Sequence, residues 1–199
     1  MTADIDLTAE SLHNLVFPID WDGLRAAATE VNAWVVIHTD DRVLVRIARS
    51  EMGQGTYTAL AQLVAEELDC DWANVTAEFA SPNEHVRRNR VWGSMSTGGS
   101  QGVRGSHDYV RKAGAAAREM LVAAAAAQWK VPAGECRTEA GQVIHKSGKK
   151  LGYGALTAPA AQLPVPATPA GAQGQSAAQD FSVALSEGGD KSGAQRQSG

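Results

Sequence analysis

The chain has 199 residues, of which 44% are hydrophobic and 20% are charged, and its formal net charge is −4 at pH 7. This composition is typical of a soluble globular domain, and it excludes a fully disordered chain, a collagen and a polybasic nucleic-acid tail. No apolar stretch approaches the roughly 18 residues that a membrane-spanning helix needs. We therefore expect neither a membrane span nor a nucleic-acid partner.

The first residues and the cysteines narrow the expectations further. The N-terminus is acidic, with Asp4, Asp6 and Glu10 where a secretory signal would be basic, so the sequence predicts a cytoplasmic protein. Cys70 and Cys136 are too few for a four-cysteine iron–sulfur cluster or zinc ribbon within this chain. If iron–sulfur electron transfer accompanies the function, another subunit must hold the cluster.

The first third of the chain predicts a small mixed α and β unit. Residues 1–31 are expected to be a weakly ordered lead-in, with one short helix over residues 21–30. Residues 33–37 are an apolar run, and residues 43–47 alternate in polarity beyond a polar turn. Two such runs predict an antiparallel β-hairpin.

The hydrophobic period then changes from two to about 3.6, which predicts an amphipathic helix over residues 57–68. Residues 74–80 are typical of a strand. Residues 81–90 are expected to be a polar loop, and a glycine-rich segment follows it. A long helix with a face of small residues is predicted over residues 103–129.

The last part of the chain carries weaker signals. Residues 142–145 predict a short strand, and residues 153–163 predict a short helix. In residues 167–199, 24 of 33 residues are Ala, Gly, Ser, Gln or Pro, so that segment buries too little apolar surface to offset its ordering entropy. We therefore expect an α+β domain over residues 32–166, in which a hairpin, helix and strand precede the long helix, and a disordered tail over residues 167–199.

One candidate binding segment, Met52, Gly53, Gln54 and Gly55, stands where a predicted strand changes to a predicted helix. Glycines permit positive φ angles and a close approach of a ligand to the backbone. The carboxamide of Gln54 can donate and accept hydrogen bonds at once. A polar ligand would also meet the free N–H groups and the positive end of the helix. The plainer alternative is a strand-to-helix turn with a surface glutamine.

A second candidate segment lies before the long helix and consists of Thr97, Gly98, Gly99, Ser100, Gln101 and Gly102. It can present many backbone amides at a helix start, an arrangement that favours phosphate oxygens. It is not a Walker loop, because no Gly-Lys-Ser/Thr follows, and it is not a dinucleotide fingerprint. The alternative is a flexible linker in which Ser100 or Ser106 caps the helix.

The remaining polar clusters have plain interpretations. Arg87, Arg88 and Arg90, with Arg104 beyond them, can contact a phosphate, but a solvated loop is the default for surface charges. The five histidines show no metal-ligand spacing, because no two lie three to five residues apart on one helix face.

In this order, the segments resemble the molybdopterin-binding subunits of the xanthine dehydrogenase and aldehyde oxidase superfamily, in particular isoquinoline 1-oxidoreductase beta subunits and related bacterial aldehyde dehydrogenases. The resemblance runs from about residue 32 to residue 166. The segments that carry it are NAWV (32–35), ARSEMGQGTYTAL (48–60), AEEL (65–68), STGGS (96–100), VRGS (103–106), AGAAAR (113–118) and LPVP (163–166).

This resemblance implies a molybdopterin cofactor, in bacteria often the cytosine dinucleotide form, whose own sulfurs hold molybdenum. It implies that the Met52 to Gly55 segment hydrogen-bonds the pterin and its phosphate region, and that the Thr97 to Gly102 segment gives amides and hydroxyls to the same cofactor. The implied reaction is oxidative hydroxylation of an N-heterocycle or an aldehyde, with oxygen from water. The electrons would leave to a small [2Fe-2S] iron–sulfur subunit.

Subunits of this family are several times longer, and their general-base glutamate lies beyond the part that this sequence matches. We therefore assign no catalytic residue, and we expect a fragment of a large subunit that is inactive without the remainder of that subunit. Family members are often periplasmic. Two alternatives stay open, which are a non-catalytic small subunit and a stand-alone phosphate- or nucleotide-binding module.

Overall fold

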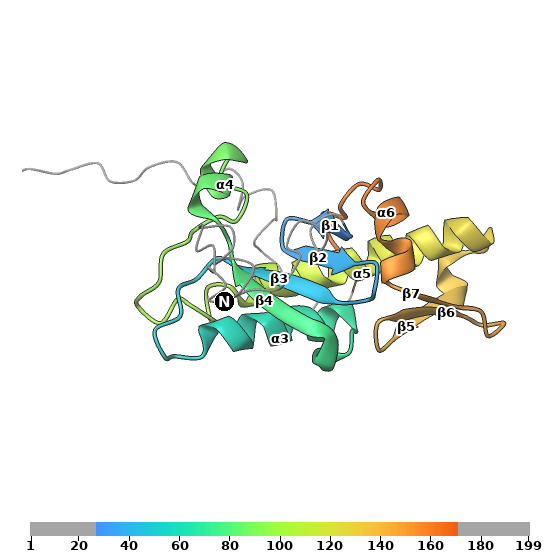
Figure 1. Cartoon of the computed structure of the whole chain (residues 1–199), viewed down its shortest axis with the longest axis horizontal. Coiled ribbons are helices and arrows are strands. Elements are labelled where there is room, and N and C mark those ends of the chain that lie inside the picture. Colours follow the sequence, from blue (N-terminus) through green and yellow to red (C-terminus); the bar gives the residue numbers. More distant parts are fainter. Residues whose placement is uncertain (1–26, 171–199) are drawn as a thin grey trace, which may run out of the picture.

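The larger of two sheets forms the centre of the molecule in a computed structural model that describes residues 27–170 (Figure 1). Its strand order is β1-β2-β3-β4, and a second sheet has the order β5-β6-β7. The strands are β1 (Ala28–Asn32), β2 (Val35–His38), β3 (Val43–Ile47), β4 (Val75–Phe79), β5 (Cys136–Glu139), β6 (Gln142–His145) and β7 (Lys150–Gly152). The helices are α3 (Thr56–Leu68), α4 (Pro82–Arg87), α5 (His107–Trp129) and α6 (Thr157–Ala160), with 3-10 turns η1 (Trp72–Asn74), η2 (Ala133–Glu135) and η3 (Gly154–Leu156).

The predicted hairpin, helix and strand are confirmed. β2 and β3 pair antiparallel, and the alternation in β3 buries Val43, Val45 and Ile47 against the core. Helix α3 then connects β3 to β4, which pairs with β3 in parallel. The loop that leads into α3 therefore lies at the end of β3.

The predicted helix over residues 21–30 is wrong for residues 28–30, because β1 begins at Ala28, within the predicted lead-in. β1 forms an antiparallel hairpin with β2. The side chain of Asn32 holds the turn, since its Oδ1 accepts the backbone N–H groups of Trp34 and Val35 at 3.0 and 3.1 Å. This pairing overrides the alanine-rich local propensity. Residues 1–26 of the predicted lead-in lie outside the described residues.

Helices α3 and α5 pack against each other and against the sheet, and their contact explains the stripe of small residues on α5. The buried positions on α5 include Ala113, Gly114 and Ala117. A Cβ atom on Gly114 would lie only 2.6 Å from the carbonyl oxygen of Val64 in α3. The predicted face of small residues thus lets the two backbones approach closely.

Two boundaries differ from the prediction. The predicted loop over residues 81–90 contains α4, because Ser81 accepts the N–H of Glu84 at 3.4 Å and Pro82 fits the first turn. The long helix begins at His107 rather than at residue 103, because a series of turns fills residues 102–106.

The predicted strand is β6, and it lies in the second sheet between β5 and β7. The sequence analysis missed β5 and β7. Both are short, and β5 turns into β6 through Ala140 and Gly141, each with a positive φ angle. The predicted helix over residues 153–163 is formed in its central part as η3 and α6. Residues 167–170 of the predicted tail lie against α5, where Glu119 accepts the N–H of Ala170; residues 171–199 lie outside the described residues.

The mixture of helices and strands confirms the predicted α+β class. In the part of the chain that the structure describes, no helix combines the length and the apolar character needed to cross a bilayer.

Candidate functional site

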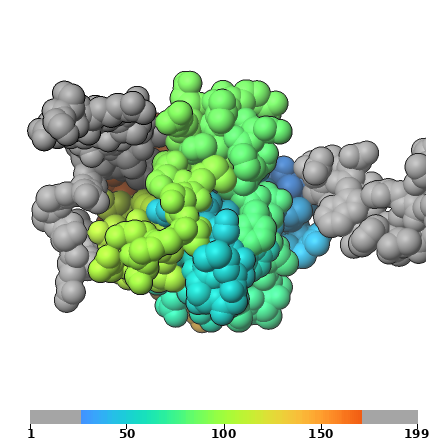
Figure 2. All heavy atoms as spheres, turned by 90° about the vertical axis from the view of Figure 1, so that its left-hand side faces the viewer, coloured from blue at the N-terminus to red at the C-terminus, as the bar shows by residue number. Residues whose placement is uncertain are grey.

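The two glycine-rich segments lie side by side at one end of the molecule, as Figure 2 shows for residues near 50 and near 100. The backbone N–H of Ser50 donates to the Thr97 hydroxyl at 2.8 Å. A Cβ atom on Gly102 would lie 2.9 Å from the Oγ1 atom of Thr56, at the first residue of α3. We call residues 49–56 and 94–106 together the two-loop surface. The structure thus brings together the two segments that the sequence singled out.

Gln54 uses both ends of its carboxamide within its own loop. Its Nε2 donates to the carbonyl of Ser50 at 2.7 Å, and its Oε1 accepts the N–H of Met52 at 2.5 Å. Gly53 and Gly55 have φ angles of 93° and 77°, which side chains other than glycine rarely adopt. Met52 to Gly55 are all exposed. In this structure Gln54 therefore shapes the loop.

The N–H groups of Gly53, Gly55 and Tyr57, around the start of α3, are not free, which corrects the sequence-based expectation for these three amides. One oxygen of Glu51 accepts the N–H groups of Gly53 and Gly55 at 2.7 and 3.0 Å, and the other accepts that of Tyr57 at 2.9 Å. These backbone hydrogen bonds, first that of Tyr57 and then that of Gly55, hold the pKa of the Glu51 carboxyl below its ordinary value. The carboxylate thus engages three of the amides that the sequence analysis left for a ligand.

The second glycine-rich segment is folded on itself rather than attached to a helix start. The N–H of Gln101 donates to the carbonyl of Gly98 at 2.9 Å. Ser100 has a φ angle of 55°, which is uncommon for a residue with a Cβ atom. Because α5 begins at His107, residues 97–102 do not meet its N–H groups directly. Thr97 and Gly102 are half-buried, and Gly98 to Gln101 are exposed.

Neither serine caps α5 in the expected way. Ser106 is the residue before the helix, but its side chain accepts no helix N–H. Its hydroxyl oxygen instead accepts hydrogen bonds from the Tyr109 hydroxyl at 2.6 Å and from Nε of Arg49 at 3.0 Å. Ser106 is completely buried.

The sequence analysis missed Arg49, which connects the two loops. Only 6% of Arg49 is exposed. Its Nη1 donates to the Ser94 hydroxyl at 3.4 Å and to the carbonyl of Ser96. The sequence signal for this residue is an arginine directly after an apolar strand, in the sequence IAR at 47–49. Arg49 fixes the second loop to the end of β3.

The basic cluster is built into the structure through ion pairs. Arg88 pairs with Glu30, and Arg87 pairs with Glu84. The guanidinium groups of Arg46 and Arg88 lie 5.9 and 5.6 Å from the ring centre of Trp92. The Arg88–Glu30 pair joins the residue after α4 to β1, and the Arg87–Glu84 pair lies within α4, so both arginines have partners without a phosphate.

No group of three or more metal-ligating side chains occurs within residues 27–170. His145 contacts Glu135 through Nε2 at 3.0 Å and Ser147 through Nδ1 at 2.7 Å. Both cysteines are free thiols. Burial raises the pKa of Cys70 to about 12, so this thiol is unreactive near neutral pH.

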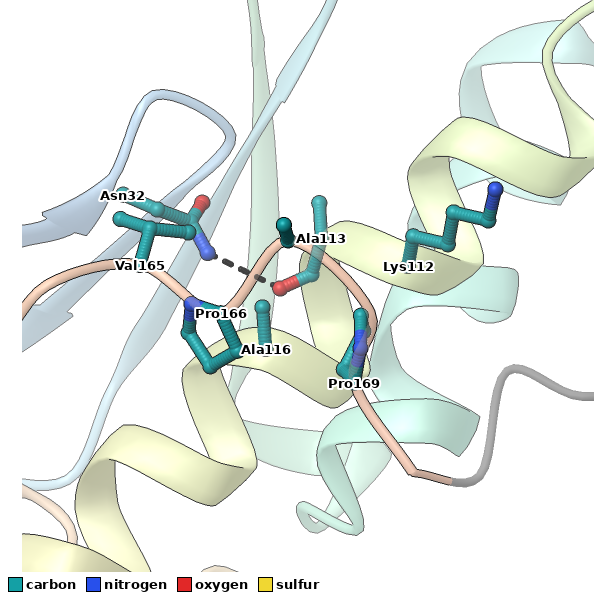
Figure 3. A pocket seen from close by; sticks show the side chains of 8 residues that line it. Asn32, Lys112, Ala113, Ala116, Val165, Pro166 and Pro169 are labelled. Carbon is teal, nitrogen blue, oxygen red and sulfur yellow. Dashed lines mark hydrogen bonds between the residues drawn. The ribbon is translucent and has the colours of Figure 1, made fainter. Parts of the chain in front are cut away.

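A small cavity is lined by no residue of the two-loop surface (Figure 3). It is bounded by the β1 end of the sheet, helix α5 and the proline-rich segment, and its lining residues are Asn32, Lys112, Ala113, Ala116, Val165, Pro166, Ala167 and Pro169. Its volume of about 10 Å³ holds at most one water molecule. The two-loop surface is open rather than enclosed, since Met52 in its first loop is 72% exposed.

The described residues form a domain of mixed α and β structure in which two glycine-rich loops are in contact. The family described as molybdopterin cofactor-binding domain matches residues 12–195, and the chain belongs to this family. It is 41% identical over 134 residues to the isoquinoline 1-oxidoreductase subunit beta of Brevundimonas diminuta, covering 66% of this chain and 17% of that protein. It is 34% identical over 145 residues to the membrane-bound aldehyde dehydrogenase [pyrroloquinoline-quinone] of Gluconacetobacter polyoxogenes, covering 73% of this chain and 18% of that protein.

Two solved structures are also similar. One is a Cu,Mo-CO dehydrogenase in its carbon monoxide reduced state, with a TM-score of 0.47 and 21% identity over 61% of this chain and 15% of that one. The other is quinoline 2-oxidoreductase from Pseudomonas putida 86, with a TM-score of 0.42 and 19% identity over 65% of this chain and 16% of that one. The chain spans less than a fifth of each curated relative that it matches.

The residues of the two-loop surface fit a phosphate-bearing pterin. Arg49 is a nearly buried cation that has no carboxylate within ion-pair distance among residues 27–170. The exposed backbone of Gly98 and Gly99 leaves room for a ligand to approach closely. The exposed segments Met52 to Gly55 and Gly98 to Gln101, together with Arg49, are therefore the residues that would hold the cofactor.

Proposed function

We propose that the chain binds a molybdopterin cofactor on the two-loop surface and so contributes to a molybdenum hydroxylase. The observation that carries this proposal is the direct contact of the two segments, in which Thr97 accepts the N–H of Ser50. Membership of the molybdopterin cofactor-binding family supports it. The name of the second relative points to pyrroloquinoline quinone instead, but the family match covers residues 12–195 and favours molybdopterin.

In this proposal, ten residues bind the cofactor: Met52, Gly53, Gln54, Gly55, Thr97, Gly98, Gly99, Ser100, Gln101 and Gly102. The cofactor is the cytosine dinucleotide form. When bound, it supplies the redox chemistry for hydroxylating an N-heterocycle or an aldehyde. Thr97 and Gly102 position the second loop against the start of α3, and Gln54 keeps the first loop closed.

The partners in this proposal are a small [2Fe-2S] subunit and the remainder of the molybdopterin-binding subunit. The chain corresponds to 17% and 18% of its two curated relatives, so we propose that it is inactive without the rest of such a subunit. General-base and positioning groups each contribute orders of magnitude to a rate.

Metal and pterin analysis of purified protein tests this function. The chain is produced in a host that makes the cofactor, alone and together with the two partners, and molybdenum, pterin and cytidine are measured per chain. Molybdenum and cytidine in equal amounts in either preparation support the proposal. Bound nucleotide without molybdenum in both preparations would identify a nucleotide-binding module and refute it.

A variant assigns the site to the first loop. Gln54→Ala removes the carboxamide that closes this loop, so cofactor occupancy is expected to fall severalfold. Gln162→Ala, at an exposed position after α6, is the matched control and is expected to keep full occupancy. Equal occupancy in both variants would remove Gln54 from the site.

A further inference from the structure

Arg49 is a buried cation whose hydrogen-bond partners are all neutral. It lies just after β3, it is 6% exposed, and it donates to hydroxyl and carbonyl oxygens of the second loop. Its three partners are Ser94, Ser96 and Ser106. These contacts position the guanidinium but do not balance its charge.

The contrast with Glu67 shows how unusual this is in the described part of the chain. Glu67 is 8% exposed, and Arg111 neutralises it with a hydrogen bond of 2.7 Å from Nε. Among residues 27–170, no carboxylate lies within ion-pair distance of Arg49. Glu51, two residues away, instead accepts backbone N–H groups at the start of α3. Burial of an unbalanced charge is costly in solvation free energy, so a bound anion would be favourable here.

One edge of the guanidinium remains available to such an anion. Nε and Nη1 are engaged, whereas Nη2 has no hydrogen-bond partner within residues 27–170. Nδ1 of His38 is the one side-chain nitrogen or oxygen atom in that range that is fully enclosed and has no hydrogen-bond partner. The Nη2 atom of Arg49 is therefore unpartnered but not fully enclosed by residues 27–170.

We propose that Arg49 binds a phosphoryl oxygen through Nη2 and supplies the countercharge for the phosphate part of the ligand on the two-loop surface. This inference rests on the proposed function. It identifies a residue outside the two glycine-rich segments, and it gives a full positive charge to a site that the glycines alone do not supply. A planar guanidinium held at Nε and Nη1 is preorganised for an oxyanion.

Anion binding to the full chain tests this role without loaded enzyme. Thermal unfolding is followed with increasing inorganic pyrophosphate, with cytidine diphosphate, and with sulfate at matched ionic strength. We expect pyrophosphate to raise the unfolding midpoint with saturation, Arg49→Lys to weaken the apparent affinity at least tenfold, and Arg49→Gln to abolish the effect. Arg137→Lys on β5, at the other end of the molecule (Figure 1), is expected to behave as wild type. Tighter binding of cytidine diphosphate would identify a nucleotide as the phosphate source.

A spectroscopic measurement on the wild-type chain covers the case in which Arg49 variants do not fold. Nuclear magnetic resonance of the arginine guanidinium groups locates the bound anion without a substitution. Pyrophosphate is expected to shift the guanidinium signals of Arg49 with saturation and to leave those of Arg137 unchanged. Equal shifts for both residues, or equal stabilisation by sulfate, would overturn the proposal. Pyrophosphate binding without molybdenum in the co-expressed complex would refute the proposed function and leave Arg49 as an anion site.

Discussion

The close approach of α5 to α3 predicts that Gly114→Ala destabilises the domain. A Cβ atom at this position would lie 2.6 Å from the carbonyl oxygen of Val64 and 3.3 Å from the N atom of Leu68. To reach an ordinary contact of 3.4 Å, the helices must separate by about 0.8 Å, since 3.4 minus 2.6 is 0.8. The obstructing atoms belong to the backbone of α3, which cannot move aside as a flexible side chain can.

The magnitude is the difference between two opposing effects. Overpacking a buried contact costs about 1–3 kcal/mol, and the rigid backbone at this position favours the upper end. Alanine in a helix interior gains about 1 kcal/mol over glycine. The expected loss is therefore about 2 kcal/mol, which corresponds to roughly 4–8 °C in the unfolding temperature of a chain of this size.

Urea unfolding followed by circular dichroism measures this difference. Gly134→Ala is the matched control, because a Cβ atom there meets nothing within 4 Å and Gly134 has no positive φ angle. We expect the control variant to remain within about 0.5 kcal/mol of wild type. If Gly114→Ala were as stable as wild type, the helices would not be packed backbone against backbone.

Three further predictions concern titratable groups. The pKa of Glu51 is lowered in the folded chain, so its contribution to stability is present above pH 4.5 and is lost as the pH falls through the folded pKa. The urea midpoint of Glu51→Gln should therefore lie below that of the wild type at pH 7. The two midpoints should converge in acid. Burial lowers the pKa of His85 below 6.5, so stability should decrease as the pH falls from 6.5, and His85→Gln should reduce this slope in the same assay. Because the pKa of Cys70 is about 12, a thiol reagent at pH 8 should modify Cys136 well before Cys70, as peptide mass spectrometry would show. A stability difference between wild type and Glu51→Gln or His85→Gln that does not change with pH would contradict the pKa shift assigned to that residue. An identical labelling rate for the two thiols would contradict the pKa shift assigned to Cys70.

The strongly periodic segments could be predicted because local pattern and tertiary burial agree in them. In β3, the alternation of Val43, Val45 and Ile47 is also the alternation of burial. The apolar stripe of α3 is likewise the side that it buries. The order of strand, helix and parallel strand then places the first glycine-rich loop at the end of β3.

The elements that were missed depend on partners that local patterns do not reveal. β1 begins in an alanine-rich stretch, and its pairing with β2 determines its structure. β5 and β7 have four and three residues, too few for a period to be visible. Helix α4 is different, because Ser81, Pro82 and Glu84 are a helix-start signal that the basic composition of this segment obscured.

The chemistry of the candidate site could be predicted only in part, because the side chains that set its charge are outside the glycine-rich motifs. A helix N-terminus carries about half a positive charge, and the sequence pattern alone leaves it free for a ligand. The Glu51 carboxylate reaches four residues along the chain to Gly55 and six to Tyr57, and so it covers that charge. The full charge of Arg49 is held by residues of the second loop, which are 45–57 positions away. An anion on the two-loop surface is therefore attracted by Arg49, which only the folded arrangement of the two loops presents to it. Substitution of Arg49 should thus lower phosphate affinity more than any glycine substitution that leaves the loops folded.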